Sequence, residues 1–161
     1  MGTTRVTAER GLPFIDVTRE FDAPRELVYR CHLEPELVKQ WLGPRRLTMV
    51  IDRWDPRDGG SWRYIHRDTD GTEYGFHGVF HGEQTAERMT QTFEFEGAPS
   101  HVSLDTVTLE DHDGRTIARI HSVHQTVEGR DAMIASGMEG GLREGYEQLD
   151  ELLMKLSAPV H

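Results

Sequence analysis

The chain is 161 residues long and carries a formal net charge of −10, from 28 acidic and 18 basic residues. With no run of Lys or Arg, this balance argues against phosphate backbones and anionic membrane surfaces, so neither nucleic acid nor a membrane is expected as a partner. The length suits one domain, which we expect to span residues 1–161 with a flexible tail at 1–12. The single cysteine, Cys31, and a polar N-terminus without a signal-peptide core predict a cytoplasmic protein, and no apolar run approaches the roughly 18 residues of a membrane span.

Strand-like alternation begins after the tail, where Ile15, Val17 and Phe21 alternate with polar residues. Two short helices are expected next, one after Pro24 and one over residues 35–41. Further segments with a period of two, separated by Gly, Pro and Asp clusters, complete a sheet of six or seven strands. The strand ranges are 14–21, 47–54, 61–67, 72–83, 89–96, 102–110 and 116–127. Because strands and helices do not alternate, the pattern predicts an α+β fold with an antiparallel sheet.

The last long segment, residues 131–156, has the period of an amphipathic helix. Its glycines Gly137, Gly141 and Gly145 recur every fourth residue, although each costs about 1 kcal/mol relative to Ala inside a helix. Gly145 lies near the centre of the apolar stripe and offers the sheet no side chain. Such glycines allow either the close approach of a neighbouring backbone or a space left open for a ligand. Of the two, we expect a curved sheet that wraps around this helix, with a hollow beneath Gly145.

Short motifs occur in a fixed order along residues 14–156, nearly the whole chain. They are Ala23-Pro24, Glu34-Pro35-Glu36-Leu37, Gln40-Trp41-Leu42-Gly43-Pro44, Gly59-Gly60-Ser61-Trp62-Arg63, Asp70-Gly71, Gly78-Val79-Phe80, Gly114-Arg115-Thr116 and Gly137-Met138-Glu139. Together they resemble the SRPBCC (START-like, Bet v 1-like) superfamily, in the branch named for homology to the activator of Hsp90 ATPase.

This resemblance implies the helix-grip fold, in which a curved antiparallel sheet holds a long C-terminal helix over a hydrophobic cavity. Members of the superfamily bind lipids, polyketides, steroids or other apolar molecules, some cyclise polyketides, and some act as antibiotic-resistance proteins. The chain departs from the family pattern at Gly82, where a carboxylate is usual, and at Met138, where an aromatic residue is common.

Aromatic residues and a few polar ones share the expected inner face, where they either line a ligand site or fill a core. Arg19 interrupts the apolar face of the first strand, and an inward Arg needs a partner or a ligand anion. His66 shares a face with Trp62 and Tyr64. Either it acts on a ligand as an acid, a base or a hydrogen-bond donor, or it is a strand-end histidine in water. The candidate ligand-binding residues are Arg19, Trp41, Trp62, Tyr64, His66, Phe76, Phe80, Gln91, Phe93, Met138, Leu142, Gly145 and Tyr146.

The nine histidines do not form a recognisable metal site. His77 and His81 would lie about 13 Å apart along one strand, too far to share an ion. The sequence also lacks a nucleophile elbow, a phosphate loop and a dinucleotide motif. We therefore expect no metal and no cofactor, and the sequence does not establish catalysis.

Three interpretations remain at this stage. The first is a monomeric or homodimeric protein that holds a small hydrophobic or aromatic molecule between sheet and helix, for sequestration, transport or self-resistance. The second is an enzyme of the polyketide cyclase or aromatase type, which uses a pocket His or Tyr. The third is a protein-interaction module related to the Hsp90 co-chaperones, which would need an exposed apolar patch and no cavity.

Overall fold

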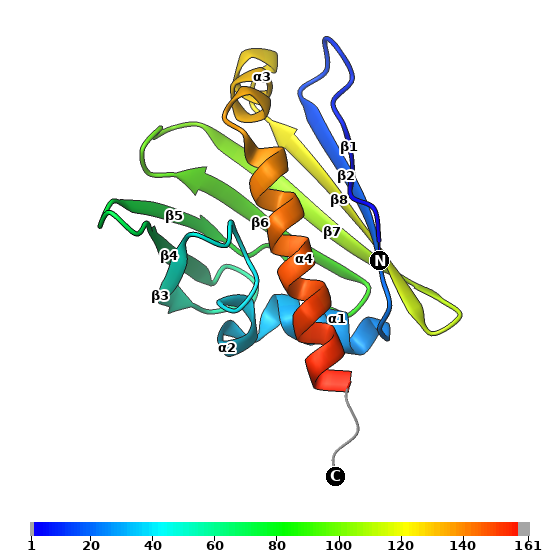
Figure 1. Ribbon diagram of the computed structural model, residues 1–161. Helices are drawn as coiled ribbons and strands as arrows, with labels where there is room; N and C mark the ends of the chain where they lie inside the picture. Colours follow the sequence, from blue (N-terminus) through cyan, green and yellow to red (C-terminus); the bar gives the residue numbers. More distant parts are fainter. Residues whose placement is uncertain (1, 158–161) are drawn as a thin grey trace.

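The computed structural model describes residues 2–157 as one open, fully antiparallel sheet of eight strands with a long helix across one face (Figure 1). The strands are β1 (Arg5–Thr7), β2 (Phe14–Phe21), β3 (Thr48–Trp54), β4 (Ser61–Arg67), β5 (Glu73–Val79), β6 (Arg88–Phe95), β7 (Val102–His112) and β8 (Arg115–His124). Their order in the sheet is β1-β2-β8-β7-β6-β5-β4-β3. The α+β, helix-grip architecture expected from the sequence is confirmed.

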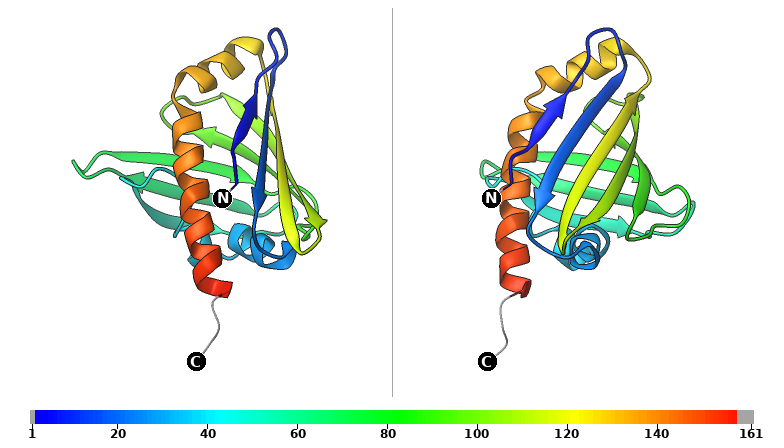
Figure 2. Two further views of the ribbon diagram at one scale, coloured as in Figure 1. Left: turned by 45° about the vertical axis from the view of Figure 1, so that its right-hand side comes forward. Right: turned by 90° about the vertical axis from the view of Figure 1, so that its right-hand side faces the viewer.

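The helices are α1 (Arg25–Leu33), α2 (Pro35–Val38), α3 (Val127–Ala135) and α4 (Met138–Ser157). Figure 2 shows the sheet bending around α4, with α1 near the C-terminal end of that helix. Within residues 2–157, no helix is both long and apolar enough to span a membrane.

Local sequence explains the strand boundaries. The β7–β8 hairpin turns at Asp113 and Gly114, whose φ angles of 54° and 82° are the left-handed pair that a type I′ turn requires. Along β2, Ile15, Val17 and Phe21 are buried while Asp16 is exposed, so one face of the strand meets the core. The period-two pattern therefore fixes both the strand and the face that it buries.

Two sequence expectations need correction. The tail predicted at residues 1–12 includes β1, which pairs with β2 in the register Val6 to Val17 and adds the eighth strand to the sheet. The single helix predicted over residues 131–156 is two helices, because Gly137 adopts φ +86° and ends α3 before α4 begins. Residue 1 and residues 158–161 of the predicted domain lie outside the described residues.

Candidate functional site

The face of the sheet that meets α4 divides into two parts that differ in exposure. The first, here called the closed half, is fully buried and consists of Ile15, Val17, Phe21, Met89, Leu109 and Ala118 of the sheet with Tyr146, Leu149, Leu152 and Leu153 of α4. The second, here called the open half, is only half-buried and consists of Phe76, Gln91, Phe93, Asp105, Val107 and Ile120 of the sheet with Met138 and Leu142 of α4. The open half is where a ligand could contact the inner face of the sheet.

The closed half is a packed core in which several predicted site residues lie. The Tyr146 ring meets Phe21 edge-on at 5.3 Å between centroids and stacks on Trp41 at 6.1 Å. The indole N–H of Trp41 donates to the carbonyl of Cys31 at 2.8 Å. Both aromatic residues thus have core partners, and their role as ligand contacts stays a prediction.

Gly145 does not face a hollow. A Cβ on this residue would lie 3.1 Å from the carbonyl oxygen of Trp41 and 3.2 Å from the amide nitrogen of Gly43. The glycine therefore lets the backbone of the 41–46 loop press against α4, and the open space expected beneath it is filled by that loop. The prediction was wrong because the partner is a loop backbone about one hundred residues earlier in the chain, which helix periodicity does not reveal.

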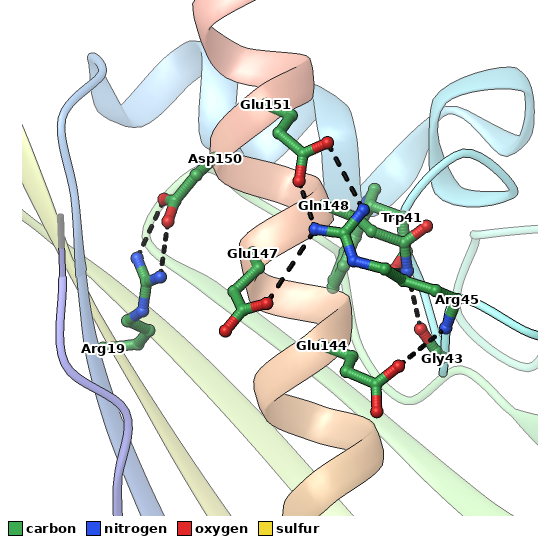
Figure 3. A network of polar contacts seen from close by, with 9 residues as sticks. All are labelled: Arg19, Trp41, Gly43, Arg45, Glu144, Glu147, Gln148, Asp150 and Glu151. Carbon is green, nitrogen blue, oxygen red and sulfur yellow. Dashed lines mark hydrogen bonds and ion pairs between the residues drawn. The ribbon is translucent and has the colours of Figure 1, made fainter.

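Arg19 has an internal partner instead of a free site for an anion. Its guanidinium donates two hydrogen bonds to Asp150 of α4, at 2.9 and 2.5 Å (Figure 3). It donates a third to the carbonyl of Glu20 at 2.8 Å. Arg19 also lies over the Phe21 ring, 4.8 Å from its centroid. Because the arginine side chain is only 2% exposed, the carboxylate of Asp150 neutralises a charge that would otherwise be buried alone.

The 41–46 loop is fastened to the opposite side of α4 (Figure 3). The side-chain amide of Gln148 donates to the carbonyls of Trp41 and Gly43, at 3.3 and 2.8 Å. The amide of Arg45 donates to Glu144 at 3.1 Å, and its guanidinium pairs with Glu151. These contacts hold α4 between the loop and β2.

The remaining aromatic candidates form a cluster on β4, β6 and β5 with the residue that follows it, and the cluster shares Phe76 and Phe93 with the open half. Trp62, Tyr64 and Phe80 are buried, while Phe76 and Phe93 are half-buried around them. Tyr64 stacks on Trp62 and on Phe76, with both centroid distances 5.2 Å. Burial raises the pKa of the Tyr64 hydroxyl, so this group stays protonated at neutral pH. The structure thus brings these five residues together as one aromatic surface.

His66 extends this surface, with ring centroids 5.0 Å from Tyr64 and 5.4 Å from Phe76. It is buried at 5% exposure rather than standing in water, and a Cβ on Gly43 would lie 2.6 Å from its ring. Burial lowers the pKa of His66, so the ring is neutral at pH 7. Its Nε2 is covered and has no hydrogen-bond partner among the described residues.

A polar row that the sequence analysis missed crosses the inner face of the sheet. The strand registers pair Ile15 with Ser122, Ser122 with Asp105, and Asp105 with Gln91, and Gln91 bridges to Phe80. Only Gln91 was a candidate. The signal was present in the alternation of β7, where inward positions 103, 105, 107 and 109 include a carboxylate.

The side chains of the inner face are mostly apolar or aromatic, with a few polar groups among them. Among residues 2–157, no group of three His, Cys, Asp or Glu side chains is placed to hold a metal ion. The one cysteine, Cys31, is buried, and burial raises its pKa to about 11, so it is a thiol and not a nucleophile at neutral pH. What the open half offers is apolar and aromatic surface with a few hydrogen-bonding groups, which is the usual composition of a small-molecule site.

Comparisons with known proteins agree with this fold. The family model for Activator of Hsp90 ATPase homolog 1-like protein matches residues 22–154. A solved structure from Rhodobacter sphaeroides is 24% identical, covers 95% of this chain and 99% of its own, and has a TM-score of 0.86. A Mycobacterium smegmatis protein is 22% identical over 100% of both chains, with a TM-score of 0.86. An Arthrobacter aurescens solution structure is 27% identical, covers 94% and 91%, and has a TM-score of 0.86. No match is found among curated proteins.

Proposed function

The chain belongs to the family of Activator of Hsp90 ATPase homolog 1-like proteins, and from that premise we propose that it binds one small, mostly apolar aromatic molecule in the open half. The ligand would lie between the sheet and the first turns of α4. Its role would be sequestration, transport or self-resistance, without chemical change of the molecule.

The observation that carries this proposal is the incomplete cover of the inner face. Val107 and Ile120 pack against the same core as Met138 and Leu142, yet all four stay half-buried. Apolar surface that remains in contact with water favours a ligand, at about 25 cal/mol per Å² of apolar area that the ligand covers. The aromatic cluster at its edge supplies flat faces against which a ring can stack.

Two glycines in the first turns of α4 explain why the protein's own side chains do not fill the open half. Gly140 is exposed and a Cβ there would meet nothing within 4 Å, while Gly141 faces the ring of Pro44 in the 41–46 loop. The first two turns of the helix therefore direct only Met138 and Leu142 towards the core. A helix with two glycines in its first turns is less stable than an Ala- or Leu-rich helix. The space that remains for a ligand is the functional advantage that compensates for this loss of stability.

A fluorescent probe tests the proposal. N-phenyl-1-naphthylamine, which is neutral and aromatic, is expected to bind the folded protein at one site, with enhanced probe emission and a change in Trp emission. Val107→Phe should weaken binding at least several-fold because the new ring fills the open half. Leu104→Phe is the matched control, since Leu104 lies on the same strand but is 42% exposed on the opposite face.

The denaturant midpoint of each variant shows whether it remains folded. Binding that appears only where the protein begins to unfold contradicts the proposal, because the aromatic cluster is then plain core. Equal binding by both variants also contradicts it, since the probe then lies elsewhere. Conversion of a bound polyketide into product would favour the cyclase-type alternative.

A further inference from the structure

Asp105 places a carboxylate in the middle of the open half. It lies on β7 between Ser122 of β8 and Gln91 of β6, with the apolar pair Val107 and Ile120 one row away. A carboxylate among apolar neighbours is unfavourable unless its oxygens receive hydrogen bonds. Its position therefore calls for a partner.

The described residues satisfy this carboxylate only in part. The Oδ1 atom of Asp105 is covered and has no hydrogen-bond partner among residues 2–157. Burial raises the pKa of Asp105, and the hydroxyl groups of Ser122 and Ser103 beside it act in the opposite direction. A buried acceptor left unsatisfied costs more than an ordinary hydrogen bond contributes, so a donor that reaches Oδ1 is favoured.

Cations near the inner face are already neutralised. Of the buried basic side chains in the described part of the chain, Arg19 is paired with Asp150, and Arg130 is paired with Asp131 and donates to the carbonyl of Glu9. His66 is neutral at pH 7 because burial lowers its pKa. An anionic ligand in the open half would therefore meet an acidic neighbour and no free cation.

From these contacts we infer that the open half selects aromatic molecules that carry a hydroxyl or amine hydrogen-bond donor, which binds Oδ1 of Asp105, and rejects carboxylic acids. The inference rests on the proposed function. The ring lies against Val107, Ile120 and Phe93, and its donor points at the carboxylate. Because Oδ1 is covered, half-buried side chains around it change rotamer when the donor enters.

Three ligands with one ring system test this on the intact protein, namely 2-naphthol, naphthalene and 2-naphthoate, measured by quenching of Trp emission at pH 7. We expect 2-naphthol to bind about tenfold more tightly than naphthalene, since a hydrogen bond to an acceptor oxygen that is otherwise unsatisfied supplies that difference. We expect 2-naphthoate to bind more weakly than naphthalene. This comparison needs no variant and so does not depend on the folding of one.

Two substitutions then assign the preference to one atom. Asp105→Leu should bind naphthalene and 2-naphthol equally, with naphthalene affinity unchanged or improved. Asp105→Asn keeps an acceptor oxygen and should retain part of the preference. A 2-naphthol preference that survives in Asp105→Leu overturns the inference, as does tighter binding of 2-naphthoate by the wild type. Equal binding of all three ligands overturns the inference while the proposed function stands, and no binding of any of them contradicts the proposed function itself.

Discussion

The two halves of α4 lie over the same sheet but contact it differently. In the closed half, Tyr146, Leu149 and Leu153 are at most 2% exposed and fill the space above β2 and β8. In the open half, Met138 and Leu142 leave the sheet half-exposed beneath them. Since the sheet alternates in the same way under both, the side chains of the helix decide which part of the inner face becomes core and which part stays half-buried.

The largest effect should come from the ion pair that holds the closed half together. Asp150→Ala leaves Arg19, 2% exposed, without its carboxylate, and should lower the free energy of unfolding by about 3–5 kcal/mol. Glu151→Ala is the matched control, because it removes an exposed pair with Arg45 from the next residue of the same helix and should change stability little. Urea denaturation measures both. Similar losses in the two variants would mean that the buried pair does not anchor α4.

Alanine substitutions of two leucines of α4 compare the two halves directly. Leu149→Ala should cost about 2–5 kcal/mol, because Leu149 is fully buried and its removal leaves a cavity. Leu142→Ala should cost clearly less, since Leu142 is half-buried, but should weaken binding of N-phenyl-1-naphthylamine. Urea midpoints and probe titrations on both variants give the comparison. If Leu142→Ala is as destabilising as Leu149→Ala, the open half is core.

A third comparison concerns two glycines of α4. Gly145→Leu should lower the free energy of unfolding by about 1–3 kcal/mol, because its side chain must displace the backbone of Trp41 and Gly43. Gly140→Leu should raise it by up to about 1 kcal/mol, since the position is exposed and gains helix propensity. Thermal melts of both variants suffice. A more stable Gly145→Leu protein would show that the 41–46 loop is free to move away.

The smallest effect is a pH dependence in the open half. The folded-state pKa of Asp105 is raised above its ordinary value of 3.8, so this group adds stability below about pH 4 and that contribution is lost as pH rises through the raised pKa. Asp105→Asn lacks this titration, and its stability relative to wild type should therefore increase between pH 4 and pH 7. Denaturation at several pH values measures the difference. A difference that does not vary with pH would mean that Asp105 is solvated like a surface carboxylate.

The sequence alone predicted the sheet and the inward face of its strands, because a period of two and Gly-containing turns are local properties. Gly137 was wrongly placed inside a helix for the same reason, because sequence spacing reports only local periodicity. A glycine at the interval of Gly141 and Gly145 looks like part of one helix, and only its left-handed φ shows that α3 ends there.

The candidate site was less predictable, because its contacts join distant segments. The aromatic residues Trp62, Tyr64 and Phe76 were identified since they alternate on neighbouring strands. Arg19 was identified as an inward charge, but Asp150 lies on the polar side of the helix period and gave no sign of being its partner. Asp105 was missed because the alternation of residues 102–110 shows that it shares a face with Val107 and Leu109, but not that Ser122 and Gln91 flank it in the sheet.

The most direct test locates a bound ligand by NMR. We predict that intermolecular nuclear Overhauser effects from N-phenyl-1-naphthylamine reach the methyl groups of Met138, Leu142, Val107 and Ile120 and do not reach those of Leu149, Leu152 or Leu153. That result would place the ligand in the open half, above the aromatic cluster. Contacts with the three closed-half leucines, or a folded protein that shows no intermolecular contacts at saturating probe, would contradict the division of the inner face into core and binding site.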